Sequence, residues 1–223
     1  MAGSVAYVVG RQGLRLTATL PTCCMGPMSD SERNASRTAR MVAAYRGRSS
    51  EGAEAVCDDP WALALAGEDG LKTADAYERY FPHMQLWLGL RTRFLDDLVV
   101  RAIAAGCTQI VLLGAGLDTR AARFGRPGVV FYEVDLPASQ SDKRARLAAL
   151  SGYPIEAATY VACDFERDDF LERLEAEGFR SDVQAVFVWE GVTYYLNEPA
   201  VRATALFLPS LSLSRLRLTR FGP

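Results

Sequence analysis

The stretch QIVLLGAGLDTRAARF, residues 109–124, decides the fold of this chain. An apolar run ends in Gly-Ala-Gly, and an acid and an arginine follow shortly after it. A short apolar run of this kind is typical of a strand that is buried on both faces of a parallel sheet. Because glycine has no Cβ atom, Gly114 and Gly116 let the backbone turn sharply and approach a ligand closely. Ligands of open parallel sheets bind beyond the carboxyl ends of the strands, so this turn predicts a ligand site.

The surrounding sequence alternates strand and helix patterns and predicts an α/β fold. Further strands are predicted at residues 129–135, 158–164 and 183–190, and helical patterns separate them at residues 117–124, 139–150 and 166–179. Such alternation indicates right-handed β-α-β units and a parallel sheet. Upstream, we predict helices at residues 31–48 and 84–105, with a short helical segment between them that Gly67 and Gly70 close. We expect these upstream helices to pack over the ligand edge of the sheet.

Three local details accompany these helices. Asp30 or Ser31 can cap the first helix, and a serine can cap the helix at residues 139–150. Gly106 ends the helix at residues 84–105. The apolar stripe predicted for that helix consists of Leu90, Phe94, Leu95, Leu98 and Ile103.

The sequence predicts one folded domain without repeats or a low-complexity linker. The first 29 residues contain arginine but no acid, which can indicate a transit peptide. We favour a natural start at Met28, where a clean helical pattern begins. The expected organisation is an unstructured extension at 1–27 and a single domain at 28–223, with a helical cap at 28–106, a sheet core at 107–200 and an atypical tail at 201–223.

The composition excludes several classes of function. The chain has 223 residues, is 49% hydrophobic and carries a net charge of −2, so it has no bulk attraction for nucleic acid or an anionic membrane. No apolar run approaches the ~20 residues that span a bilayer. Five cysteines without a C-x-x-C pair argue against a disulfide framework, and we expect a cytoplasmic protein. The single histidine, His83, excludes a histidine-rich metal site, and its aromatic and apolar neighbours favour packing over catalysis.

Acidic residues at the strand ends indicate the kind of ligand. A dinucleotide fingerprint has a third glycine where this chain has Thr119, and the Asp118 carboxylate would repel a pyrophosphate. Asp118 suits a cationic ligand or an amine instead. Asp135 lies 135 − 116 = 19 residues beyond Gly116, a spacing at which an acid can accept the hydroxyls of an adenosine ribose. Either Asp135 or the nearby Glu133 could instead cap the next helix, and we select Asp135 for the ribose because it lies at the strand tip.

The ends of the last two strands offer further candidates. Asp164 can accept the exocyclic amine of adenine and Phe165 can cover its ring, but Asp164 could equally cap the helix that follows. After the fourth strand, Glu190 precedes Tyr194 and Tyr195. These two tyrosines could wall a substrate pocket or belong to the core, and the spacing does not decide between the two.

Seven stretches occur together in the order of a known family: SRTARMVAAYR, DDPWA, LRTRFLDD, VLLGAGLDTRAARF, FYEVDLP, ACDF and VWEGVTYYL. Through them the chain resembles the S-adenosylmethionine-dependent methyltransferases of the leucine carboxyl methyltransferase type, in particular their bacterial O-methyltransferase branch. The resemblance covers roughly residues 36–200. It implies a Rossmann-like class I methyltransferase fold and S-adenosyl-L-methionine as cofactor.

The resemblance also implies roles for single residues. Arg91 would pair with the methionine carboxylate, although its helix could equally present surface pairs such as Arg93 with Asp97. Glu190 would contact the methionine amine or face the substrate. The remaining cofactor residues are Gly114, Ala115, Gly116 and Asp118 at the methionine moiety, Asp135 at the ribose, and Asp164 with Phe165 at the adenine; Tyr194 and Tyr195 would meet the substrate.

The expected activity is methyl transfer to a carboxylate or hydroxyl of a small-molecule acceptor. A carboxylate acceptor needs no general base, and the sequence identifies no base for a hydroxyl. The sequence SLSLSRLRLTRFGP at residues 210–223 departs from the family pattern. We therefore expect a truncated or altered member with an incomplete C-terminal part of the sheet. The alternative function is a catalytically impaired cofactor-binding or interaction protein.

Overall fold

A four-stranded parallel sheet forms the centre of the structure, a computed structural model that describes residues 5–10, 13–19 and 31–213. Its strands are β3 (Gln109–Leu113), β4 (Val130–Asp135), β5 (Ala158–Ala162) and β6 (Ala185–Trp189). The order is β5-β4-β3-β6, with each pair parallel. The predicted strands and their parallel arrangement are therefore confirmed. Strand β3, which leads into the glycine turn, lies inside the sheet with a neighbour on each side.

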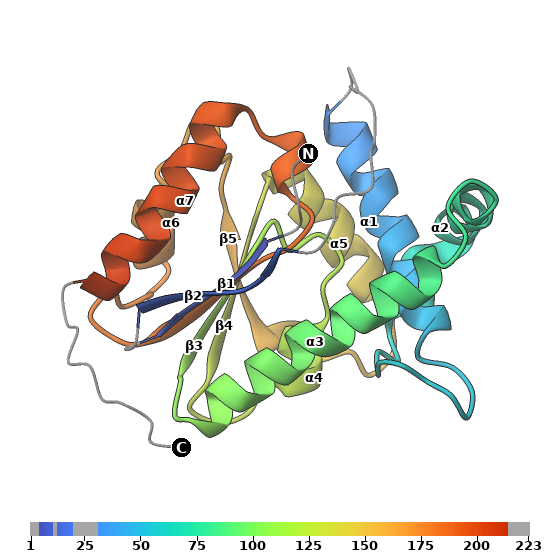
Figure 1. Cartoon of the computed structure of the whole chain (residues 1–223), viewed down its shortest axis with the longest axis horizontal. Helices are drawn as coiled ribbons and strands as arrows, with labels where there is room; N and C mark the ends of the chain where they lie inside the picture. The colour runs from blue at the N-terminus through green and yellow to red at the C-terminus, as the bar shows by residue number, and fades with distance from the viewer. Residues whose placement is uncertain (1–4, 11–12, 20–30, 214–223) are drawn as a thin grey trace.

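Alternate residues of the strands supply two separate cores, and Figure 1 shows helices on both faces of the sheet. Val111 and Leu113 point to the face covered by α6 (Phe170–Ala176) and α7 (Glu198–Leu213). Ile110 and Leu112 point to the opposite face, where α3 (Met84–Ala104) and α4 (Arg120–Phe124) pack. Since every residue of β3 is buried, both faces of this strand are shielded, as its unbroken apolar sequence predicts.

A third core joins the upstream helices to the sheet. It lies between α1 (Ser31–Arg48), α2 (Ala62–Glu78) and α5 (Pro137–Ala148), and Leu117 connects it to the turn after β3. Ala43, Ala44 and Tyr45 of α1 are fully buried, and the Tyr45 hydroxyl donates to the carbonyl of Ala74 over 2.8 Å. The predicted helix at 31–48 is confirmed, while the possible cap Asp30 lies outside the described residues.

Of the two glycines predicted to close the second helix, Gly67 interrupts the helical conformation and Gly70 does not. Helix α2 kinks at Gly67, where φ is 62° and ψ is −176°, and then continues to Glu78. At Gly70 a Cβ atom would lie 2.7 Å from the carbonyl oxygen of Arg40, so this glycine lets α2 approach α1 closely. Packing against α1 therefore accounts for Gly70, whereas Gly67 marks a break in the helix.

Details of the other helices also differ from the prediction. In α3 the side chain of Leu90 is 54% exposed, so Leu90 does not belong to the buried stripe. Helix α5 begins with Pro137 at its first position and has no serine cap. Helix α6 begins at Phe170 and is capped by Asp169, whose carboxylate accepts from the N–H groups of Leu171 and Glu172. Two short 3-10 turns complete the description, η1 (Ile155–Ala157) and η2 (Thr193–Tyr195).

The N-terminal segment differs from the expected unstructured extension. Strands β1 (Val5–Gly10) and β2 (Gly13–Thr19) form an antiparallel hairpin. The hairpin lies beside β6 and α7, and Figure 1 shows it as the dark blue strands in front of the sheet. In the part of the chain that the structure describes, no helix is long and apolar enough to cross a membrane.

Candidate active site

A cavity of about 320 Å³ lies at the carboxyl ends of the strands, beneath α1. The turn after β3 and the segments that follow β4, β5 and β6 all reach it. The structure brings ten of the predicted site residues to its wall: Arg91, Gly114, Ala115, Gly116, Asp118, Asp135, Asp164, Phe165, Glu190 and Tyr195. Tyr194 is not part of this wall, and its side chain is 43% exposed.

The glycine turn has a backbone conformation that other residues adopt only with strain. Gly114 has φ of 64° and Gly116 has φ of 48°, both in the left-handed region. The N–H of Gly114 donates to the carbonyl of Val134 over 2.7 Å, which ties the turn to β4. A Cβ atom at Gly114 would lie only 2.2 Å from Cγ2 of Val192. Glycine is therefore required here both by the backbone angle and by the close approach of Val192.

Asp135 fixes the tip of β4 to this turn. Its carboxylate accepts from the N–H of Gly116 over 2.6 Å and from the N–H of Leu136 over 2.7 Å. Burial raises the pKa of Asp135, although these two backbone donors oppose the shift. Glu133 points away from the cavity wall into the protein, where its carboxylate pairs with Lys143 Nζ at 2.5 Å. Of the two acids on this strand, only Asp135 lines the cavity, and no side chain caps α5.

Arg91 and Glu190 form an ion pair at the cavity wall. Nε of Arg91 donates to Oε1 of Glu190 over 2.7 Å, and the guanidinium lies 4.7 Å from the ring centre of Trp87. The Arg91 side chain is only 8% exposed. Arg93, two positions along the same helix, is 61% exposed and pairs with Asp97 over 3.0 Å. The alternative of an ion pair on the helix surface therefore holds for Arg93, whereas Arg91 is buried at the cavity wall.

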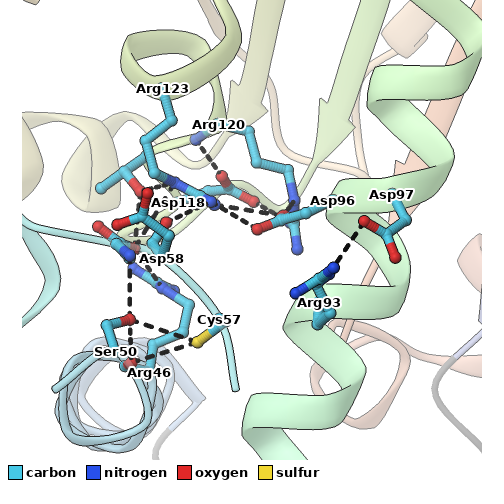
Figure 2. A network of polar contacts seen from close by, with 12 residues as sticks. Arg46, Ser50, Cys57, Asp58, Arg93, Asp96, Asp97, Asp118, Arg120 and Arg123 are labelled. Atoms are coloured by element: carbon cyan, nitrogen blue, oxygen red, sulfur yellow. Dashed lines mark hydrogen bonds and ion pairs between the residues drawn. The ribbon is translucent and has the colours of Figure 1, made fainter. Parts of the chain in front are cut away.

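A network of buried ion pairs lies directly beneath the turn (Figure 2). Nε of Arg46 binds Asp59 over 2.7 Å, and the second guanidinium nitrogen, Nη2, donates to the carbonyl of Leu117 over 2.6 Å. Arg120 pairs with Asp96 over 2.7 Å, and Arg123 pairs with the same carboxylate over 2.5 Å. With Arg91, four arginines thus meet four carboxylates in this region, namely Asp59, Asp96, Asp118 and Glu190. The floor of the cavity is consequently charge-balanced.

The same network changes the interpretation of Asp118. Its carboxylate pairs with Arg120 and also accepts from the Arg120 N–H over 2.7 Å. Burial alone would raise the pKa of Asp118, but Arg120, Arg46 and Arg123 outweigh burial and lower it to about 2. Asp118 is therefore ionised and already neutralised by an arginine, so it is not an unpaired acid awaiting a cation.

Asp164 and Phe165 line the cavity next to β5. Oδ1 of Asp164 accepts from the N–H of Glu166 over 3.0 Å, which stabilises a turn. Because Asp169 caps α6, the alternative that Asp164 caps that helix is wrong. The Phe165 ring lies 6.1 Å from the ring of Phe170 and joins the cavity wall to the core.

The comparison with known sequences identifies the family of this chain. The profile described as leucine carboxyl methyltransferase matches residues 39–208. The chain belongs to this family. A relative from Mycobacterium marinum is 36% identical over 193 residues, which are 81% of this chain and 64% of the relative. A relative from Mycobacterium avium is 38% identical over 81% of this chain and 63% of its own length. One from Mycolicibacterium vanbaalenii is 33% identical over 87% of this chain and 68% of its own length.

Each of these three relatives carries the name "Putative S-adenosyl-L-methionine-dependent methyltransferase". This chain spans about two thirds of their length. Membership in the leucine carboxyl methyltransferase family identifies the parallel sheet as a Rossmann-like methyltransferase fold.

Sequence reasoning missed the part of the site that α1 contributes. In this family member, Thr38, Val42 and Arg46 line the cavity at four-residue intervals, together with Ala39. This spacing places the three side chains on one face of a helix. It is the sequence pattern from which their shared position in the site could have been predicted. Tyr195 faces the same region, where burial raises the pKa of its hydroxyl and a hydrogen bond with Thr38 opposes the shift.

Proposed function

We propose that this chain is an S-adenosyl-L-methionine-dependent O-methyltransferase that acts on a carboxylate or hydroxyl of a small-molecule acceptor in the cytoplasm. The observation that carries the proposal is the Arg91–Glu190 pair at the rim of the glycine turn, 2.7 Å apart and almost fully buried. The amino-acid part of the cofactor is a zwitterion, so it needs one cation and one anion close together. Relatives of this chain that carry the methyltransferase name support the same assignment.

The other residues of the cavity suit the rest of this cofactor. Arg91 would hold its carboxylate and Glu190 its ammonium, while Gly114 lets the backbone approach the methionine moiety. Asp135 at the tip of β4 offers carboxylate oxygens for ribose hydroxyls. Asp164 would accept the adenine amine, and Phe165 would cover the ring. The cofactor carries no phosphate, which agrees with acids at the strand tips and with the absence of a third glycine.

The protein's contribution to methyl transfer would be alignment. When bound, S-adenosyl-L-methionine supplies a methyl group that its sulfonium centre activates. The residues around the cavity hold cofactor and acceptor in line, and such positioning is worth up to about 7–11 kcal/mol. The pKa of Glu190 is lowered, because Arg91 and Arg120 outweigh the effect of burial. Glu190 is therefore a weak base, and its part is to bind rather than to remove a proton.

Calorimetric titration with S-adenosylhomocysteine tests the proposal, with NADH as the control ligand. We expect micromolar affinity for S-adenosylhomocysteine and no measurable heat with NADH. Release of S-adenosylhomocysteine during incubation with S-adenosyl-L-methionine and candidate acceptors then separates transfer from binding alone. A folded chain that binds neither ligand would contradict the proposed function.

Arg91→Met is expected to weaken binding of S-adenosylhomocysteine by about ten- to a hundredfold, since it removes a buried charge-assisted contact. Arg93→Met provides the matched control, because Arg93 lies on the same helix but is exposed and pairs with Asp97 at the surface. We expect its affinity to stay within about twofold of the original. Equal losses in the two variants would show that Arg91 contributes only through the stability of α3.

A further inference from the structure

Arg120 lies beneath the cavity and bonds two carboxylates of its wall. Its side chain is 2% exposed. One terminal nitrogen, Nη1, contacts Asp118 and lies 3.1 Å from Oε2 of Glu190. Arg120 itself is not among the residues that line the cavity, whereas Asp118 and Glu190 are. Arg120 therefore reaches the cavity wall through its contacts with these two carboxylates.

The protein fixes Arg120 from the opposite side as well. Its Nε donates to Oδ1 of Asp96 on α3 over 2.7 Å, and Arg123 binds both oxygens of Asp96 over 2.5 and 3.2 Å. Helix α3 also carries Arg91, whose Nε holds the other oxygen of Glu190. Glu190 is consequently held between an arginine from α3, Arg91, and an arginine from α4, Arg120.

We propose that Arg120 is a positioning residue for the cofactor: it keeps the carboxylates of Glu190 and Asp118 ionised and oriented toward the cavity, so that Glu190 can accept the ammonium group. This inference rests on the proposed function, because it assigns Glu190 to the amino-acid part of S-adenosyl-L-methionine. It goes further by placing the control of that contact in a residue that the ligand does not touch.

The charges around Glu190 indicate how its pKa would change if Arg120 were removed. Burial would raise the pKa of Glu190, and Arg91, Arg120 and Arg46 lower it, while Asp118 acts against them. Without Arg120, the carboxylates of Glu190 and Asp118 would face each other with one cation fewer, so the pKa of each would rise. A protonated Glu190 accepts an ammonium poorly. Ligand affinity would then fall as the pH drops through the raised pKa.

Arg123 provides a matched control within the same helix. Its side chain is 6% exposed, close to the value for Arg120, and it shares the partner Asp96. Its other hydrogen bonds go to Thr119 and to the carbonyl of Asp58. Replacing either arginine leaves Asp96 with one arginine, but only the loss of Arg120 removes a direct contact with the two cavity carboxylates.

The test is titration of S-adenosylhomocysteine between pH 5 and pH 8 into the full chain and into Arg120→Met, Arg120→Lys and Arg123→Met. We expect Arg120→Met to bind about tenfold more weakly at pH 8, and to lose further affinity toward pH 5 while the original chain does not. Arg120→Lys keeps the positive charge, so its affinity should depend less on pH than that of Arg120→Met. It is the variant to measure if Arg120→Met does not fold. A pH profile of Arg120→Met that matches that of Arg123→Met would overturn the proposal.

A second readout uses the ligand-free chain. Carboxyl NMR titration of Glu190 should give a higher pKa in Arg120→Met than in the original chain, and an unchanged pKa in Arg123→Met. If the original chain does not bind S-adenosylhomocysteine, the proposed function fails, and this titration still decides whether Arg120 controls Glu190. An unchanged Glu190 pKa in Arg120→Met would refute the positioning role even if the chain binds the ligand.

Discussion

Gly114→Ala is expected to cost about 2–5 kcal/mol of the free energy of unfolding, as the sum of an unfavourable backbone angle and overpacking. It should also weaken S-adenosylhomocysteine binding by about a hundredfold, because the turn must shift at the cavity wall. The physical reason is that φ at Gly114 is 64° and that the new Cβ would meet Cγ2 of Val192 at 2.2 Å. Urea unfolding and calorimetric titration measure the two effects.

Gly128→Ala isolates the contribution of the backbone angle. Gly128 has φ of 83°, but a Cβ atom there would have nothing within 4 Å. We expect this variant to lose only about 1–2 kcal/mol and to keep its ligand affinity. The double variant Gly114→Ala with Val192→Ala should recover part of the lost stability, since it removes both Cγ atoms of Val192. If Gly114→Ala costs no more than Gly128→Ala, the close approach of Val192 is not a constraint.

Lys143→Met is expected to destabilise the protein by about 3–5 kcal/mol, because it leaves the Glu133 charge buried without its cation. Both residues are 1% exposed, and Nζ of Lys143 also donates to the carbonyl of Asp118 over 2.6 Å. Oε1 of Glu133 has no hydrogen-bond partner among the described residues, so the remaining acid would have little compensation. Chemical denaturation of the variant and of the original chain gives the difference.

Two further variants separate the buried pair from ordinary surface charge. Lys72→Met removes an exposed pair with Glu68 and should change the stability by less than about 1 kcal/mol. The double variant Glu133→Leu with Lys143→Met replaces the buried pair with apolar groups and should recover most of the loss. A double variant as unstable as Lys143→Met would contradict this account.

The pH dependence of stability follows from the same pair. Burial raises the pKa of Glu133, and Lys143 opposes the shift. A native-state pKa above that of the unfolded chain means that the folded protein binds more protons, so stability is lost as the pH rises. The loss begins near the unfolded value of about 4.3 and continues through the raised native pKa. We expect Lys143→Met to steepen this loss and the apolar double variant to remove it.

The strands of the sheet could be predicted from the sequence because each is a continuous apolar run. Burial on both faces leaves such a signal in a few adjacent residues, as in β3 and β6. The tips of parallel strands meet at one edge, so the sequence could also predict that Asp135, Asp164 and Glu190 line one cavity. The roles of these residues toward a ligand remain predictions.

The partners of the arginines could not be predicted, because they lie far apart in the sequence. Arg120 and Glu190 are separated by 70 residues, and Arg46 and the carbonyl of Leu117 by 71. Local patterns contain no information on such contacts. For the same reason Gly70 suggested a helix end, although its close approach to Arg40 of α1 places it inside α2. Leu90 fits the helical period of α3 yet lies on an exposed part of its surface.

The charge-balanced floor has a consequence for the response to ionic strength. Exposed cations that attract phosphate lose their effect as salt screens them beyond about 10 Å at 0.1 M, whereas buried pairs are screened much less. Arg46, Arg91 and Arg120 are each bound to a carboxylate inside the protein. A small zwitterion held by such pairs would keep its affinity over a wide range of salt. Binding of the cofactor would then depend little on the salt concentration in the cell.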